Sequence, residues 1–192
     1  MLVFLRHGQT AVNAEGRLLG RADPELTELG FAQARAAAVA IGEVGRVVSS
    51  PLQRARVTAE CFGVPVEIDD RWIELDYGDY DGRPFQEVPA DVWARWRSDP
   101  SFVPPGGESL TALGVRVREA CSALTDEAAE RDVVVVSHVS PIKAAVAWAL
   151  GVGDEVAWRM FLDVAAITRI GIGPRGPSLR SYNERSHLMA VG

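Results

Sequence analysis

The sequence predicts an α/β fold in which helices cover a largely parallel sheet. Short apolar runs that are typical of buried strands alternate along the chain with longer segments of helical pattern. The chain has 192 residues, 47% of them apolar, which suits one domain with a single sizeable core. Charged residues make up 24% of the chain, which favours a folded protein over a disordered one. We therefore expect one domain over residues 1–192.

Six apolar runs predict the strands. The run at 1–5 is continuous, which is typical of a strand buried on both faces, and four valines at 133–136 give the strongest strand signal. Pro65 indicates that 64–68 lies at a sheet edge, because proline cannot donate to a strand ladder. The other predicted strands are at 46–49, 165–172 and 179–182.

Helical patterns separate these strands. Ser50 and Pro51 are typical of a helix start, with serine as the N-cap and proline at the first helical position. The segment 72–82 is rich in aromatic, acidic and glycine residues and predicts a loop, and the sequence PPGG at 104–107 predicts a firm break. The predicted helices run from Thr27 to Gly42 or Gly45, and over 50–62, 85–96, 109–130 and 141–150.

Composition excludes several classes of function. Asp and Glu number 26 against 20 Lys and Arg, and a net charge of −6 makes non-specific nucleic-acid binding a poor prediction. The most apolar stretch, 133–152, is interrupted by His138, Pro141 and Lys143, so we expect no membrane span. Neither cysteine, Cys61 nor Cys121, has metal-ligand spacing. Because no leader pattern or disulfide framework is evident, we expect the cytoplasm as the compartment.

Two histidines follow the two strongest strand runs. Parallel strands end on the same side of a sheet, so His7 and His138 are expected to meet there. Arg6 precedes the first histidine, and Arg54 lies in the first turn of a helix that follows another strand end. Two guanidiniums and two imidazoles form a cradle for a tetrahedral dianion, because arginine binds phosphate oxygens in pairs. The backbone N–H groups of residues 139 and 140 would add donors.

Five motifs follow one another along the chain. They are RHGQT at 6–10, SPLQRARVTA at 50–59, IELDYGDYDG at 73–82, PPGGES at 104–109 and VVVVSH at 133–138. In this order they resemble the motifs of the histidine phosphatase superfamily, also called the phosphoglycerate-mutase-like family, and the resemblance covers the chain from about residue 3 to residue 187. It implies a three-layer α/β/α sandwich with a mostly parallel central sheet.

The resemblance also implies roles for single residues and a metal-independent phosphatase without cofactors. His7 would be the nucleophile that forms a phosphohistidine, and Glu74 the acid that protonates the leaving group and later acts as base. The phosphoryl group would be held by Arg6, Asn13, Arg54 and His138.

The chemistry of these groups agrees with the implied roles. A neutral imidazole is a competent nucleophile when its other nitrogen donates to an acceptor, and we expect a backbone carbonyl there. Glu74 can act as an acid only when protonated, and apolar neighbours such as Trp72 and Leu75 would raise its pKa by burial. Asp76 is the substitute if Glu74 points away, while the acids at 79 and 81 are expected to be solvated.

Departures from the family pattern leave alternatives open. Val139 stands where the family often has glycine, and it narrows the pocket. Leu18 and Leu19 stand where mutases of the family tend to carry polar side chains, which favours the phosphatase branch. A phosphoglycerate mutase is the second hypothesis. A protein that binds phosphorylated ligands without catalysis is the third.

A helical insert at about 83–108 is expected to cover the site as a lid. Its aromatic residues either pack the insert against the body or form a wall for a bulky alcohol, with an arginine of the insert for a second anionic group. They are Phe85, Trp93, Trp96 and Phe102, among Arg83, Arg95 and Arg97. His187, near the C-terminus, is expected to be structural. The expected partner is a small-molecule phosphomonoester, and a homodimer is a further possibility because family members are often dimers.

Overall fold

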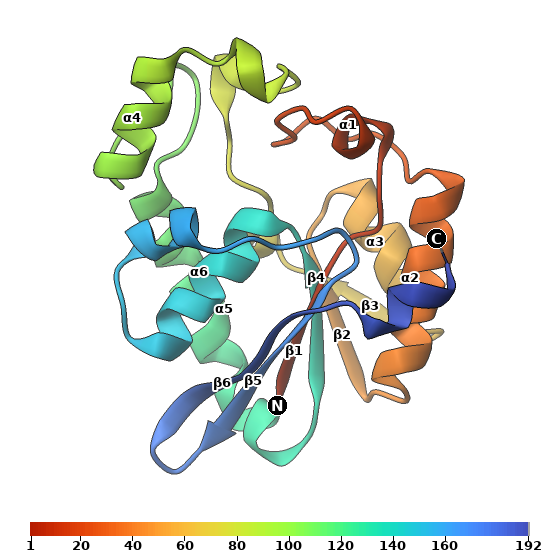
Figure 1. The fold of residues 1–192 in the computed structure, drawn as a ribbon. Helices are drawn as coiled ribbons and strands as arrows, with labels where there is room; N and C mark the ends of the chain where they lie inside the picture. Colours follow the sequence, from red (N-terminus) through yellow and green to blue (C-terminus); the bar gives the residue numbers. More distant parts are fainter. Residues whose placement is uncertain (192) are drawn as a thin grey trace.

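A mixed sheet lies at the centre of the computed structural model, which describes residues 1–191 with six strands in the order β3-β2-β4-β1-β5-β6 (Figure 1). Strands β1 to β4 are mutually parallel, whereas β5 is antiparallel to β1 and β6 is antiparallel to β5. The sheet is therefore mostly parallel, as predicted. The strands are β1 (Leu2–Arg6), β2 (Arg46–Ser49), β3 (Val66–Ile68), β4 (Val133–Ser137), β5 (Ile167–Gly173) and β6 (Gly176–Glu184).

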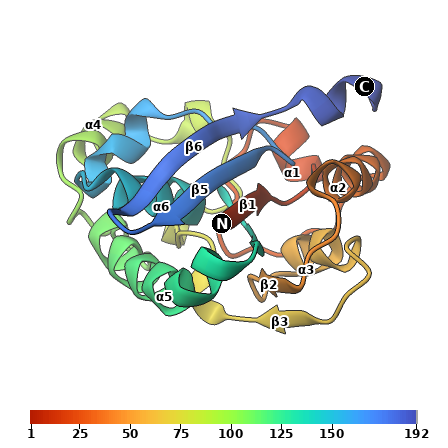
Figure 2. The ribbon, with the colours of Figure 1, turned by 90° about the horizontal axis from the view of Figure 1, so that it is seen from below.

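Helices cover both faces of the sheet, with α2 and α3 on one side and α5 and α6 on the other (Figure 2). Alternate residues of β1 serve the two layers: Val3 packs in the cluster with α2 and α3, and Phe4 packs in the cluster with α5 and α6. The predicted three-layer α/β/α sandwich is thus confirmed. The helices are α1 (Ala11–Ala14), α2 (Glu28–Ile41), α3 (Gln53–Glu60), α4 (Ala90–Ser98), α5 (Leu110–Glu130) and α6 (Val139–Leu150).

Several predicted boundaries are confirmed, and each has a local cause. Strand β2 has the expected ends, and β3 lies at the sheet edge. Thr27 caps α2 by accepting a hydrogen bond from the amide of Gly30, and Gly42 ends this helix at φ 85°. Ser109 caps α5 in the same way, through the amide of Ala112.

The predicted start of α3 at Ser50 and Pro51 is wrong, because the helix begins at Gln53. The Ser50 hydroxyl bonds to the ring of His138 and accepts from the amide of Leu52, so it is not a helix cap. The carboxylate of Asp23 accepts the hydrogen bond from the amide of Gln53 instead. A side chain from a distant loop therefore replaces the local cap.

Two other helices also differ from prediction. The segment 85–96 is a 3-10 turn, Phe85–Glu87, followed by α4, because Pro89 disfavours helical backbone at Val88. Helix α6 begins at Val139, two residues before the predicted start, since Pro141 is tolerated in a first turn. Sequence analysis missed α1, which has four residues and so shows no apolar periodicity.

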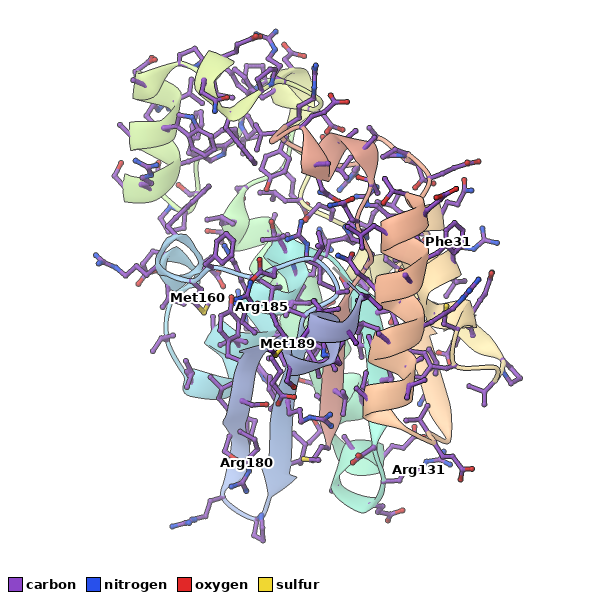
Figure 3. All side chains as sticks on the ribbon, turned by 45° about the vertical axis from the view of Figure 1, so that its right-hand side comes forward. Phe31, Arg131, Met160, Arg180, Arg185 and Met189 are labelled. Atoms are coloured by element: carbon purple, nitrogen blue, oxygen red, sulfur yellow. The ribbon has the colours of Figure 1, made fainter. Side chains whose placement is uncertain are left out.

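The strand ends that carry the site lie at one end of the molecule, beside α1 and α4. Figure 3 shows Arg131 and Arg180 at the opposite end. The C-terminal 3-10 segment, Ser186–Ala190, lies against α2, and the ring of His187 bonds to the carbonyl of Ala165 at 2.9 Å. No helix within residues 1–191 is both long enough and apolar enough to cross a bilayer.

The backbone after β1 touches the first turn of α2. A Cβ atom added at Gly30 would lie 2.1 Å from the carbonyl oxygen of Gln9. In a helix interior, alanine is normally more favourable than glycine by about 1 kcal/mol. Here the clash would instead push the first turn of α2 away from the backbone of Gln9. We expect Gly30→Ala to lower the free energy of unfolding by about 1–3 kcal/mol, measured by urea denaturation.

Gly173→Ala is the matched control, because a Cβ atom there would meet nothing within 4 Å. Equal stability of the two variants would contradict the role of the close approach.

Candidate active site

The ends of β1 and β4 bring two imidazoles together. Arg6 is in register with Ser137, so the next residue of each strand, His7 and His138, leaves the sheet at the same edge. The two ring centroids lie 5.0 Å apart, and the side chains are buried. The parallel register of two adjacent strands therefore accounts for the pairing of two residues that are far apart in the sequence.

The hydrogen bonds of His7 define its tautomer. Its Nδ1 lies 2.7 Å from the carbonyl oxygen of Gly8, which can only accept, so Nδ1 carries the proton. Its Nε2 bears no proton, and the one lone pair of this nitrogen accepts a hydrogen bond of 3.3 Å from the Nε of Arg54. The pKa of His7 lies well below its ordinary value, mainly because the ring is buried and also because of the charges of Arg54 and Arg6. The ring is a neutral imidazole with its basic nitrogen at the site.

Arg54 is wholly buried at the start of α3. Its Nη1 donates to the carbonyl of Ala22 at 2.6 Å and its Nη2 to the carbonyl of Gly20 at 2.7 Å. Asp81 holds this loop from the other side, since its carboxylate accepts from the amides of the same two residues. The expectation that Asp81 is a solvated loop acid is therefore wrong. Burial lowers the pKa of Arg54, and the nearest carboxyl groups oppose that shift.

Two buried polar atoms at the site have no partner within the described residues 1–191: Arg6 Nε and His138 Nδ1. Arg6 is fixed by a 2.7 Å hydrogen bond from Nη1 to the carbonyl of Leu162, and burial lowers its pKa to about 10. The Nε2 of His138 lies 2.7 Å from the Ser50 hydroxyl. The unpartnered buried Nε–H of Arg6 is costly, and an anion oxygen is a partner that removes this cost.

Glu74 is buried at the same site, with 3% of its surface exposed. Its Oε1 accepts from the amide of Leu75 at 2.7 Å and from the amide of Ser140 at 3.2 Å. Burial raises the pKa of Glu74 and outweighs these hydrogen bonds and the charges of Arg54 and Arg6, which lower it. The carboxyl group therefore keeps a proton at a higher pH than an exposed glutamate does.

Two expectations about this acid are corrected by its contacts. The amide of Ser140, expected to face an anion, donates to Glu74 instead. Asp76 is not needed as a substitute, because Glu74 points into the site while Asp76 accepts from the amide of Gly78 and pairs with Arg21.

A cavity of about 410 Å³ opens beside these groups. Arg6, His7, Asn13 and Glu74 line it, whereas Arg54 and His138 lie behind its surface. The Oδ1 of Asn13 accepts from the amide and hydroxyl of Thr10, which leaves its Nδ2 as the donor for a ligand. The remaining wall is largely apolar and includes Leu18, Leu19, Tyr77, Phe85, Trp93, Trp158, Phe161 and Leu162.

The aromatic residues of the insert divide between the two predicted roles. Phe85 and Trp93 line the cavity, while Trp96 and Phe102 are buried and pack the insert against the body. The three arginines lie over aromatic rings, and none of them lines the cavity. Arg83 lies over the ring of Tyr80, Arg95 over that of Phe102 and Arg97 over that of Trp93.

Sequence analysis did not name Lys143, Arg17 or Trp158 as cavity residues, and all three line it. A signal for Lys143 was present, because it lies four residues after Val139 on the helix that begins at the second histidine. Trp158 comes from a 3-10 segment, Asp154–Arg159, whose position follows only from the packing of the chain.

Comparison with known proteins identifies the family. A family model described as the histidine phosphatase superfamily (branch 1) matches residues 2–185. The chain is 37% identical to the bifunctional protein Rv2228c of Mycobacterium tuberculosis over 97% of its own length, but it spans about half (54%) of that relative. It is 33% identical to the putative phosphoserine phosphatase 2 of Hydrogenobacter thermophilus, covering 97% of this chain and 96% of that one.

Solved structures agree. A phosphoserine phosphatase mutant from Entamoeba histolytica in complex with phosphoserine has a TM-score of 0.90 and 27% identity, covering 98% of both chains. The mycobacterial glucosyl-3-phosphoglycerate phosphatase Rv2419c in complex with VO3 has a TM-score of 0.86 and 33% identity, covering 96% of this chain and 98% of that one. This chain belongs to the histidine phosphatase superfamily.

The state of the His7 ring can be measured by nitrogen-15 NMR. We expect a neutral ring in the Nδ1–H tautomer that takes up no proton as the pH falls through 6.5, because burial and two guanidiniums disfavour the imidazolium. Comparison with the spectrum of His7→Ala identifies the signal. Protonation of this ring near pH 6.5 would contradict the arrangement.

Proposed function

We propose that this chain hydrolyses phosphomonoesters by transferring the phosphoryl group first to His7 and then to water, in the manner of a histidine acid phosphatase. One observation carries the proposal. A buried imidazole, fixed by the carbonyl of Gly8 as a neutral nucleophile, shares a cavity with a buried carboxyl group of raised pKa, Glu74. A nucleophile and an acid are the two groups that cleavage of an unactivated phosphate ester requires.

In the first step, the Nε–H of Arg54 exchanges its hydrogen bond with His7 for one with a phosphoryl oxygen. The freed lone pair of His7 Nε2 then forms a bond to phosphorus while the bond from phosphorus to the ester oxygen breaks. The proton of Glu74 passes to that oxygen, and the alcohol leaves. Arg6, Arg54 and His138 stabilise the charge that the phosphoryl oxygens carry, and they are positioned before the substrate arrives. The Nδ1–H of His7 remains bonded to the Gly8 carbonyl, which stabilises the positive charge on the phosphorylated ring.

In the second step, water attacks the phosphohistidine. The bond from phosphorus to Nε2 breaks, Glu74 takes the proton of the water, and inorganic phosphate leaves. The enzyme is then restored with Glu74 protonated, so one ester and one water give one alcohol and one phosphate. The same burial that keeps the carboxyl protonated in the free site makes it a stronger base after it has donated its proton.

Three further features support hydrolysis of an organic phosphate ester. The names of the relatives, phosphoserine phosphatase and glucosyl-3-phosphoglycerate phosphatase, describe phosphatases. Leu18 and Leu19 give the cavity an apolar wall, which suits the organic part of an ester. The segment 83–108 adds Phe85 and Trp93 to that wall, so we assign it the role of a lid against the alcohol part of the substrate.

The cellular setting is part of the same proposal. Cys61 and Cys121 are free thiols, which supports a reducing cytoplasmic compartment. One sheet with a core on each face supports a single domain. The assignment as a homodimer stays a prediction.

Substitution of His7 tests the nucleophile. His7→Ala removes the only atom to which the phosphoryl group is transferred, so we expect no release of inorganic phosphate from p-nitrophenyl phosphate in the presence of a chelator. The wild-type protein is expected to release phosphate under the same conditions. Full activity of the variant would refute the assignment, and isomerisation of a phosphoglycerate that outpaces hydrolysis would indicate a mutase instead.

Substitution of Glu74 tests the acid. We expect Glu74→Gln to slow release of the alcohol from glycerol 3-phosphate in the first turnover by about 10²–10⁴-fold, because the alkoxide then leaves unprotonated. The effect on p-nitrophenyl phosphate should be far smaller, since p-nitrophenolate is a stable anion. Rapid-quench measurement of the first turnover separates this step from hydrolysis of the phosphohistidine. Equal losses on the two esters would contradict the role.

A further inference from the structure

Lys143 faces the cavity from the second turn of α6, and the proposed reaction does not use it. It lies four residues after Val139, which also lines the cavity, so the two share one face of the helix. Within residues 1–191, neither a hydrogen bond nor an ion pair holds its ammonium group. The side chain is only partly exposed.

The other cations of the cavity wall have protein partners, and the proposed reaction assigns the Nε–H of Arg6, which is free within the described residues, to the phosphoryl group. Arg6 donates to the carbonyl of Leu162, and Arg17 pairs with Glu15 and donates to the carbonyl of Gly82. Burial lowers the pKa of Lys143 to about 8, with the charge of Arg6 adding to this shift and that of Glu74 opposing it. Lys143 is therefore still mainly charged at pH 7, and a half-buried ammonium without a counter-ion is costly.

The position of Lys143 on α6 indicates which part of the substrate it faces. Side chains of a helix lean toward its N-terminus, and at the N-terminus of α6 the amide of Ser140 holds the carboxyl group of Glu74. Glu74 is the proposed donor to the ester oxygen. The ammonium group of Lys143 thus lies on the side of the cavity that receives the alcohol part of the substrate.

We propose that Lys143 binds a carboxylate on the alcohol part of the substrate, so that the preferred substrates are phosphomonoesters with this second anionic group. The inference rests on the proposed function. One ammonium neutralises one carboxylate. A second phosphate would bring about two negative charges, which a single ammonium does not neutralise.

A matched pair of esters isolates the carboxylate. 3-Phosphoglycerate has a carboxylate where glycerol 3-phosphate has a hydroxymethyl group, and the two esters are otherwise alike. We expect the wild-type protein to have the higher kcat/KM for 3-phosphoglycerate. In Lys143→Met the ratio of the two kcat/KM values should fall about tenfold or more, which is the size of a lost hydrogen bond between charged groups. Lys143→Arg, which keeps the charge, should retain most of the ratio.

Arg180→Gln is the control for loss of one positive charge, because Arg180 is exposed at the end of the molecule far from the cavity (Figure 3). This variant should keep the wild-type ratio. A fall of the ratio in Arg180→Gln equal to that in Lys143→Met would refute a local contact.

The pH dependence gives a second readout. Lys143 loses its proton as the pH rises through about 8, so the preference for 3-phosphoglycerate should decline above that pH in the wild-type protein. It should persist in Lys143→Arg, whose guanidinium stays charged. The ratio of the two kcat/KM values cancels the ionisation of groups that act on both esters. The other titratable groups that line the cavity are Arg6, His7, Arg17, Glu74, Tyr77 and Asp163.

The outcomes that overturn the proposal differ from those that overturn the proposed function. Equal losses on both esters in Lys143→Met would mean that Lys143 acts on the phosphoryl group or on Glu74, and no loss would mean that it contacts neither. If the wild-type protein fails to hydrolyse p-nitrophenyl phosphate, the proposed function fails. The contact can still be tested in that case, by calorimetric binding of the two esters to His7→Ala with and without Lys143→Met. Equal affinities of His7→Ala for 3-phosphoglycerate and glycerol 3-phosphate would refute the contact.

Discussion

The buried guanidinium of Arg54 is the constraint on which the site depends. A charged side chain without access to water needs partners for its donors, and here two loop carbonyls and the ring of His7 accept from three of the five N–H groups of the guanidinium. The loop that supplies the carbonyls is in turn held by Asp81. The direction of the nucleophile, the path of the loop after α1 and the start of α3 are consequently set together. A change in any one of them leaves a buried charge without partners.

Burial of the site has opposite effects on its two reactive groups, and both serve the proposed reaction. It disfavours the charged form of each, so the pKa of His7 falls and the pKa of Glu74 rises. Both shifts favour a neutral base beside a neutral acid, whereas in water the pKa of glutamate lies below that of histidine. The guanidiniums reinforce the shift of His7 and oppose that of Glu74, and for the latter burial is the larger effect.

Much of this arrangement could be predicted from sequence because it follows from strand ends. Continuous apolar runs mark β1 and β4, and parallel strands place the residues after each run at one edge, which locates His7 and His138. The remainder depends on contacts between distant segments, which leave no local pattern. The cap of α3 comes from Asp23, the amide of Ser140 is taken by Glu74, and Trp158 reaches the cavity from a segment without periodicity. In each case a tertiary contact replaced the partner that local rules assign.

The cavity joins two parts of different origin. Its reactive end is built mainly from residues at strand ends and first turns of helices, together with Glu74 from the loop that follows Trp72. Its wall is built from the segment around Phe85 and Trp93 and from Trp158 and Phe161, which lie outside the sheet. Trp96 anchors α4 through ring contacts with Tyr77 and Trp158, which themselves line the cavity. The shape of the wall therefore depends on the packing of one aromatic cluster, whereas the positions of His7 and His138 depend on the strand ends. Lys143 lines the same cavity from α6, and the contact proposed for it adds recognition of a charged group to a wall that is otherwise largely apolar.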